Sequence, residues 1–341
     1  MNIRKCWTVV LVGLLLAVPS MAAEFKSAKE AIEKGTALLD KGEFDKAITA
    51  FTEAIRMEPK NAEAYNGRGR AYGRKAESDK ASSDFSPAFN DFSQAIRLDP
   101  KLAGAYCGRA YVHCIRGDLK KATADCDEAL RLDPKLVRGF CVRGCIYLNE
   151  GKYDKTIAAC DESIRLDPKY SFSYCYRGYA KGKKKDFKGA ITDLTQAIRL
   201  NPKLADAFMC RSMVYLRSGD YDKSILDSTE AVRLNPKYAE PYYWRGLAQE
   251  GKGNHEKAIA DYTEAIRLDP KNPTPYYGRG LAYERTEQQS KAIDDFTEAI
   301  RLNPKDAEAY YARGYARWEI GDQKDAEADF AQAKKLGFKG K

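Results

Sequence analysis

Cysteine is the residue type with the most chemistry to offer in this sequence. Nine cysteines occur, and all but Cys6 fall between residues 107 and 210. Thiolates and thioethers are ligands for soft metals, so a soft-metal site is one interpretation of Cys107, Cys114, Cys141, Cys145, Cys175, Met209 and Met213. The compact pairs of ligands that are typical of zinc sites are absent. We therefore expect no bound metal and no cofactor.

Disulfide formation is the second chemistry open to these thiols. Cys107, Cys141 and Cys175 recur every 34 residues. If they lie on neighbouring packed helices, they are about 8–10 Å apart. That separation exceeds the limit of about 7 Å between bridged Cα atoms. A diagonal pair such as Cys107 with Cys145 stays open.

Candidates for acid–base or nucleophilic catalysis are few. The two histidines, His113 and His255, have no nucleophile at a spacing that would pair with them. Asp294 and Asp295 are adjacent, so on a helix they point to different faces and do not form a general acid and base pair. We expect a protein that is not an enzyme.

A period of 34 residues organises the whole chain after its first segment. Eight prolines carry it, each in a phrase close to Ala-Ile-Arg-Leu-Asp-Pro-Lys: Pro59, Pro100, Pro134, Pro168, Pro202, Pro236, Pro270 and Pro304. A fixed period of this length indicates one supersecondary unit that is copied and stacked. With proline counted as position 32, the units start at Ala28, Ala62, Ala103, Val137, Ser171, Ala205, Ala239, Pro273 and Ala307.

Aligned units show two helices joined by a tight turn. Position 4 is aromatic in eight units, position 8 is small in all nine, and positions 20, 24 and 27 are apolar or small at helical spacing. Glycine recurs at position 15, where it would cap the first helix. Cys126 and Cys160 occupy position 24, which holds Phe or Tyr in other units, so we expect them to be buried.

These columns resemble the tetratricopeptide repeat over residues 28–340. The resemblance implies an all-α fold, a right-handed superhelical solenoid of antiparallel helix pairs, whose first helices line a concave groove for a partner's peptide or helix. The nine predicted repeats are 28–61, 62–102 with a seven-residue insertion, 103–136, 137–170, 171–204, 205–238, 239–272, 273–306 and a C-terminal cap, 307–340. We expect the insertion, around 75–83, to be a loop.

Arginine at position 7 departs from the family, in which leucine is common there. Eight units carry it, and seven of these eight have aspartate at position 23. We predict a ladder of ion pairs between the two helices of each unit. A row of arginines that binds an acidic ligand is the alternative interpretation.

The predicted groove lies along positions 2, 5, 9 and 12 of the first helices. It is soft and apolar in the middle, then aromatic and acidic toward the C-terminus. Our candidate partner-binding residues are Asn66, Arg70, Tyr111, Cys141, Cys145, Tyr179, Met213, Tyr243, Leu247, Tyr277, Leu281, Tyr311, Tyr315 and Trp318. We expect a non-catalytic scaffold that binds another protein, and no clamp for chaperone tails. A metal- or redox-linked role for the cysteines and a structural spacer are the alternatives.

Residues 1–23 differ in composition from the rest. Arg4 and Lys5 precede an apolar run that is too short to span a bilayer, and Ser20 to Ala22 offer small residues for cleavage. We predict a signal peptide, export to the periplasm or the extracellular space, and no stable membrane insertion after cleavage. The net charge of +9 is spread along the chain among acidic residues, so we expect no nucleic-acid partner.

Overall fold

The computed structural model describes residues 25–79 and 84–339, so the predicted signal peptide at 1–23 lies outside the described residues. Eighteen helices and no strand occur within those ranges. The first helices of the nine repeats are α1 (Ala28–Asp40), α3 (Ala62–Ser78), α5 (Ala103–Ile115), α7 (Val137–Asn149), α9 (Ser171–Lys183), α11 (Ala205–Arg217), α13 (Ala239–Gly251), α15 (Pro273–Arg285) and α17 (Ala307–Glu319). Each begins at the residue where the sequence period starts a unit.

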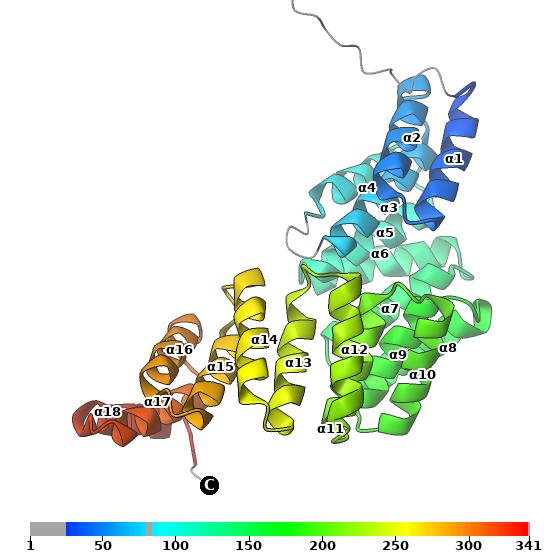
Figure 1. The fold of residues 1–341 in the computed structure, drawn as a ribbon. Helices are drawn as coiled ribbons and strands as arrows, with labels where there is room; N and C mark the ends of the chain where they lie inside the picture. The colour runs from blue at the N-terminus through cyan, green and yellow to red at the C-terminus, as the bar shows by residue number, and fades with distance from the viewer. Residues whose placement is uncertain (1–24, 80–83, 340–341) are drawn as a thin grey trace, which may run out of the picture.

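The second helices follow after short turns. They are α2 (Phe44–Met57), α4 (Ser86–Leu98), α6 (Leu119–Leu132), α8 (Tyr153–Leu166), α10 (Phe187–Leu200), α12 (Tyr221–Leu234), α14 (His255–Leu268), α16 (Gln289–Leu302) and α18 (Gln323–Lys335). Each second helix packs on its own first helix and on the first helix of the next repeat. The result is an all-α solenoid of stacked helix pairs, which curves strongly along its length (Figure 1).

Successive first helices also touch one another, as α5 touches α7 and α7 touches α9. Contacts of that kind between successive second helices are weaker or absent in the described part of the chain. The first helices are therefore crowded on the inner side of the curve, and they line its concave face.

The turn inside each repeat requires a left-handed backbone. Six glycines at position 15 have positive φ angles, for example 78° at Gly117 and 82° at Gly219. The fifth and eighth repeats lack this glycine, yet Lys185 and Glu287 adopt the same conformation, with φ of 68° and 59°. The turn is thus imposed by the stacking of the two helices even where the local residue disfavours it.

The space between the two helices of a repeat is shared by positions 8 and 24. A Cβ atom on Gly246 or on Gly280 would lie 2.6 Å from the ring of Tyr262 or Phe296, so only glycine fits against a ring. Ala110 is accommodated because its partner is the smaller Cys126. Cys126 and Cys160 are fully buried, which confirms the prediction that they are packing residues.

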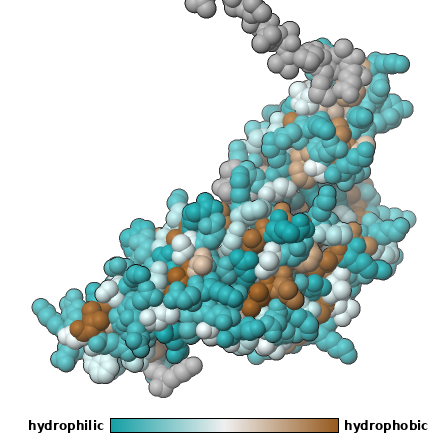
Figure 2. All heavy atoms as spheres, viewed as in Figure 1, coloured by the Kyte–Doolittle hydropathy of each residue, from teal (hydrophilic) through white to brown (hydrophobic). Residues whose placement is uncertain are grey.

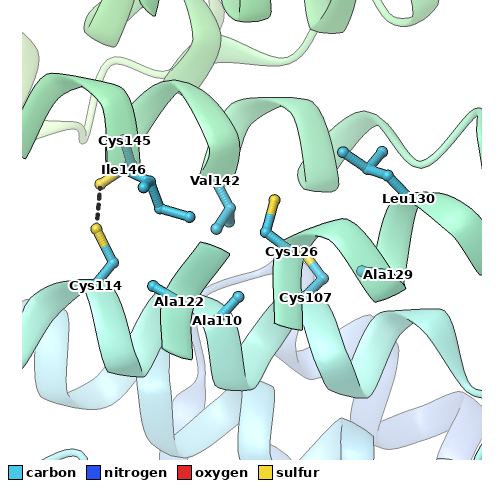
Figure 3. Close-up of a cluster of buried hydrophobic side chains, with 10 residues drawn as sticks. All are labelled: Cys107, Ala110, Cys114, Ala122, Cys126, Ala129, Leu130, Val142, Cys145 and Ile146. Atoms are coloured by element: carbon cyan, nitrogen blue, oxygen red, sulfur yellow. Dashed lines mark hydrogen bonds between the residues drawn. The ribbon is translucent and has the colours of Figure 1, made fainter. Parts of the chain in front are cut away.

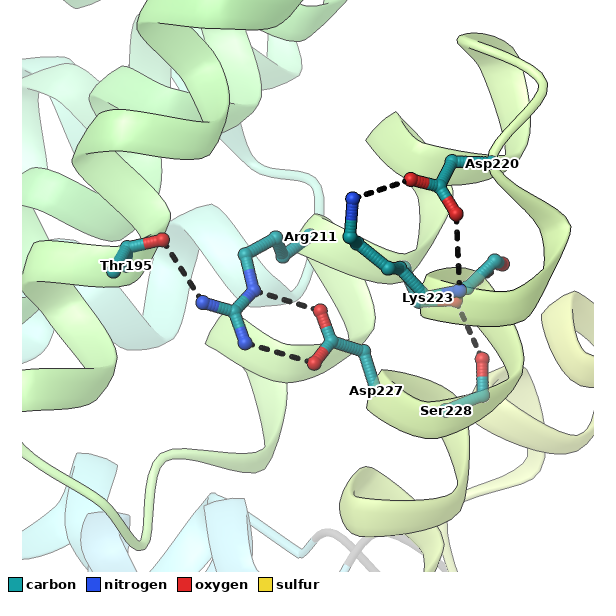
Figure 4. Close-up of polar contacts among 8 residues, drawn as sticks. Thr195, Arg211, Asp220, Lys223, Asp227 and Ser228 are labelled. Atoms are coloured by element: carbon teal, nitrogen blue, oxygen red, sulfur yellow. Dashed lines mark hydrogen bonds and ion pairs between the residues drawn. The ribbon is translucent and has the colours of Figure 1, made fainter.

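The predicted ion-pair ladder is confirmed. All seven aspartates at position 23 accept two hydrogen bonds from the arginine at position 7 of their own repeat, as Asp227 does from Arg211 at 2.7 and 2.8 Å (Figure 4). In most of these units the guanidinium also donates to the second helix of the preceding repeat, as Arg211 does to Thr195 at 2.9 Å. The fourth repeat lacks the aspartate, and its Arg143 instead pairs at 2.6 Å with Asp127 of the repeat before.

One sequence expectation about the insertion was wrong. Residues 75–78 are not a loop, because they continue α3, which has 17 residues where the other first helices have 13. Residues 80–83 of the insertion lie outside the described part of the chain.

The ladder generates a stability prediction. Replacing Asp227→Ala leaves the largely buried guanidinium of Arg211, which is 16% exposed, without its carboxylate. We expect a loss of about 2 kcal/mol, below the range for a completely buried pair because some solvent reaches the arginine. Urea titration gives the free energy of unfolding, and hydrogen exchange in α11 and α12 locates the loss.

The matched control is Asp222→Ala on the same helix. Asp222 is 76% exposed and pairs with Lys252 at the surface, so its removal should cost about 0–1 kcal/mol. Equal stability of the two variants would show that the ladder contributes nothing.

Candidate functional site

The middle of the concave face is more tightly filled than the sequence suggests. Cys141, Cys145 and Met213 are 3%, 4% and 1% exposed, and Asn66 is 7% exposed. Tyr179 is partly buried, with the Lys183 ammonium 5.1 Å from the centre of its ring. In this structure these predicted groove residues belong mainly to the core, so their contact with a partner stays a prediction.

The tyrosines farther along the groove pack on their own second helices. The ring of Tyr243 lies 6.0 Å from that of Tyr262, and Tyr277 lies 5.8 Å from Phe296. Leu247 and Leu281 join the same two clusters. Burial raises the pKa of both Tyr243 and Tyr277 to about 12. These four side chains support the fold and present only part of their surface to the groove.

Exposed aromatic surface gathers on α17. Tyr311, Tyr315 and Trp318 are 41%, 38% and 56% exposed, and Tyr311 stacks on Phe338 at 4.2 Å between ring centres. In the view of Figure 2 the molecule is largely hydrophilic, with its hydrophobic atoms mainly over the middle of the array. The last first helix therefore offers the aromatic side chains that are free to contact another molecule.

Carboxylates accompany these rings. Glu284 and Glu319 lie near Tyr315 and near each other. Burial raises the pKa of Glu284, and the negative charge of Glu319 raises it further. This end of the concave face is therefore aromatic and acidic, as the sequence predicts.

The opposite end of the concave face contains a cavity of about 260 Å³. Three predicted groove residues, Arg70, Tyr111 and Cys141, meet there. Sequence reasoning missed the residues that join them, chiefly Arg74, Arg138 and Phe172. Arg138 and Phe172 are at position 2 of their repeats, which the sequence pattern assigns to the groove. Their position in the repeat therefore predicts that they face the groove, although they are not among the candidate residues.

Four of the cysteines, Cys107, Cys114, Cys126 and Cys145, belong to one buried hydrophobic cluster near the centre of the array (Figure 3). All eight described cysteines are free and buried. The Sγ atoms of Cys114 and Cys145 lie 3.6 Å apart, so the close pair is this one and not Cys107 with Cys145. Their hydrogen bond raises the pKa of Cys114 and lowers that of Cys145.

Neither a metal site nor a catalytic constellation is apparent in the described ranges. They contain no group of three His, Cys, Asp or Glu side chains placed to hold a metal ion. Burial lowers the pKa of His113, and Nδ1 of His255 lies 2.8 Å from a carboxylate oxygen of Glu250. No described helix has the length and apolar character needed to cross a membrane.

The fold and its concave face define an α-helical repeat protein. Family models for the TPR repeat match residues 35–75, 213–253, 251–287 and 285–321, and models for the tetratricopeptide repeat match 137–170, 173–204 and 307–336. The chain belongs to the tetratricopeptide repeat family. Members of this family are typically scaffolds for protein interaction and are typically non-catalytic.

Solved structures of similar shape agree with this assignment. The chain is similar to a chain of the APC/C hetero-tetramer Cut9–Hcn1, with 14% identity, coverage of 92% and 74% of the two chains, and a TM-score of 0.69. It is similar to human IFIT1 bound to m7Gppp-AAAA, with 18% identity, coverage of 91% and 72%, and a TM-score of 0.64. A tetratricopeptide repeat protein from Parabacteroides merdae has 19% identity, coverage of 70% and 94%, and a TM-score of 0.51. At these identities the likeness shows the fold alone.

The buried thiols generate a reactivity prediction. Burial raises the pKa of Cys126 and of Cys160 to about 12, and the thiolate is the reactive form. At pH 8 iodoacetamide should leave both unlabelled in the folded protein under conditions that fully label them in urea. Peptide mass spectrometry reads each position, and rapid labelling of either residue in the folded protein would contradict the structure.

Proposed function

We propose that this protein is a non-catalytic scaffold that binds a segment of another protein, a peptide or a helix, along its concave face. The exposed aromatic surface of α17 supports this most directly, because Tyr315 and Trp318 keep large areas accessible where equivalent side chains of earlier repeats are packed. Tyrosine and tryptophan combine apolar area with a polar tip, and they are enriched among the residues that dominate interfaces.

The charge at this end of the groove indicates what composition the bound segment of the partner should have. Glu284 and Glu319 crowd the same surface, and Glu319 disfavours the ionised form of Glu284. A lysine or arginine of the partner would relieve that repulsion while an apolar side chain contacts the rings. The segment we propose therefore has apolar anchors and some basic residues.

The ligands of similar structures do not decide the partner. The matched chain of the Cut9–Hcn1 hetero-tetramer is in a complex with another protein, and IFIT1 is bound to m7Gppp-AAAA. Both share less than a fifth of their residues with this chain. The mixed charge along the chain favours a protein partner over a nucleic acid.

The test uses the double substitution Tyr315→Ala with Trp318→Ala. A photo-crosslinker at position 311 identifies the bound segment, and a synthetic peptide of that segment is then titrated by calorimetry. We expect the double variant to bind at least about 30-fold more weakly, since two central aromatic contacts contribute about 2 kcal/mol or more. Both residues are exposed, so the helical circular dichroism should not change.

Leu226→Ala is the control for this experiment. Leu226 is 69% exposed on the second helix α12, so its truncation removes exposed apolar surface outside the groove. Unchanged binding by the double variant, or equal losses in both proteins, would contradict a groove-bound partner.

We also propose that the protein is exported and that its signal peptide is removed. The charge pattern and short apolar run of residues 1–23 support this proposal. When the full-length chain is expressed in a secreting host, intact-mass measurement should find a mature protein that begins at Ala23 or Glu24. A mass that still includes Met1 to Ala22 would contradict cleavage.

A further inference from the structure

The cavity at the basic end of the groove lies where the first five repeats meet, and Leu39 and Asp40 of α1 are part of its lining. Helices α3, α5, α7 and α9 contribute to its walls. Three arginines, Arg70, Arg74 and Arg138, line it together with aromatic and aliphatic side chains, Tyr111 and Phe172 among them. A cavity with convergent cations and aromatic walls has the composition of a ligand site.

Two of these arginines differ from every arginine of the ladder. Asp40 and Glu77 also line the cavity, and Glu77 lies 3.5 Å from Arg74. Within the described ranges, Arg70 and Arg138 have no carboxylate within 4.0 Å, although both are partly buried. Elsewhere the chain provides a carboxylate for each partly buried arginine at position 7, as Asp91 does for Arg68. An unpaired cation held away from water is unfavourable.

The environment of the two groups agrees with this geometry. Burial, with a smaller contribution from repulsion by Arg138, lowers the pKa of Arg70 to about 10. Burial acts on Arg138 in the same direction, although nearby acidic groups, Cys107 and Tyr170 first among them, leave its pKa raised. Because a thiol and a phenol are neutral at pH 7, neither compensates the charge of Arg138 there. The carboxylate of Glu77 favours the charged form of Arg138, but it contributes less than these two groups and lies beyond 4.0 Å.

The extra turn of α3 holds the cavity in shape. The guanidinium of Arg74 lies 4.7 Å from the ring centre of Phe172 in the fifth repeat. Nδ2 of Asn235, between α12 and α13, donates to the carbonyl oxygen of Ser78 at 2.9 Å. The second repeat is thereby tied to the fifth and to the turn between the sixth and seventh. A second cavity of about 640 Å³ shares Arg74 and Phe172 with the first and adjoins it.

We propose that this cavity binds a small organic anion, in which a carboxylate or phosphate group lies against Arg70 and Arg138 and an aromatic or apolar body lies against Tyr111 and Phe172. Guanidinium groups match both oxyanions through paired hydrogen bonds. The volume of about 260 Å³ corresponds to about nine water molecules, which suits a metabolite-sized ligand better than a folded segment. The site is separate from the proposed partner surface on α17.

The experiment titrates the mature protein with benzoate, phenyl phosphate and neutral benzyl alcohol by calorimetry. We expect at least one of the two anions to bind, and to bind at least about tenfold more tightly than benzyl alcohol. Comparison of benzoate with phenyl phosphate separates the two oxyanions. Inorganic phosphate shows whether the aromatic body contributes, and it should bind more weakly than phenyl phosphate. Failure of both aromatic anions to bind, or equal binding by benzyl alcohol, would overturn the proposal.

The variants are Arg70→Met and Arg138→Met, which keep most of the apolar stem and remove the charge. Each should weaken anion binding at least about tenfold, whereas Arg131→Met, at an exposed rim arginine, should not. Without ligand, Arg70→Met should raise the melting temperature, because it removes an unpaired buried cation. A marked fall in melting temperature would indicate a structural role for Arg70 and contradict the proposal, as would anion binding that both variants retain.

A capped dipeptide, N-acetyl-Glu-Phe-amide, distinguishes the ligand from an acidic partner segment. Tighter binding of this dipeptide than of either small anion, with the same dependence on Arg70, would assign the cavity to a polypeptide and overturn the small-molecule proposal. Because the α17 surface is not involved, these outcomes leave the test of the proposed function unaffected.

Discussion

The array depends on the hydrogen bonds that the arginine at position 7 makes in the repeats that carry it. Its planar guanidinium donates two hydrogen bonds to the aspartate of its own second helix, and its remaining amino group reaches the second helix of the preceding repeat, as Arg279 does with Asp295 and Thr263. One side chain therefore fixes both the angle within a repeat and its contact with the neighbour. A lysine could not do this, because its ammonium is a single point of charge without the fork geometry.

The apolar packing between the helices is set by volume and not by residue type. Rings at position 24 require glycine at position 8, as Phe296 requires Gly280, while Cys126 allows Ala110. Cysteine at position 24 is thus one way to fill a fixed space. Serines fill the same space in the sixth repeat, where Ser212 at position 8 and Ser228 at position 24 hydrogen-bond at 2.5 Å. The concentration of cysteines in the sequence does not by itself require redox or metal chemistry.

Periodicity predicted the helices well because each repeat obeys local rules. The helix starts, the left-handed turn and the ion pairs all depend on residues at most 23 positions apart, and these are visible in one aligned unit. The contact of Asn235 with Ser78 depends instead on how far the superhelix turns over five repeats, and no single unit encodes that rotation. For the same reason Arg70 and Arg138, two repeats apart, could not be recognised as neighbours from their columns alone.

The pairing of charges separates structural residues from candidate functional ones. Since the ladder arginines all have partners, their burial is explained by stability, and the interpretation of that row as a ligand-binding surface loses its support. The same argument has the opposite result at Arg70 and Arg138. In the described ranges these two arginines have no carboxylate within 4.0 Å, and Asp40 and Glu77 act on them only from farther away. At the other end of the groove Glu284 and Glu319 are the corresponding case with negative charge, because these two carboxylates lie close to each other. A chain that neutralises its buried charges so consistently along the ladder leaves unbalanced charge of one sign at each end of its concave face, and there a ligand of opposite sign would complete the pairing.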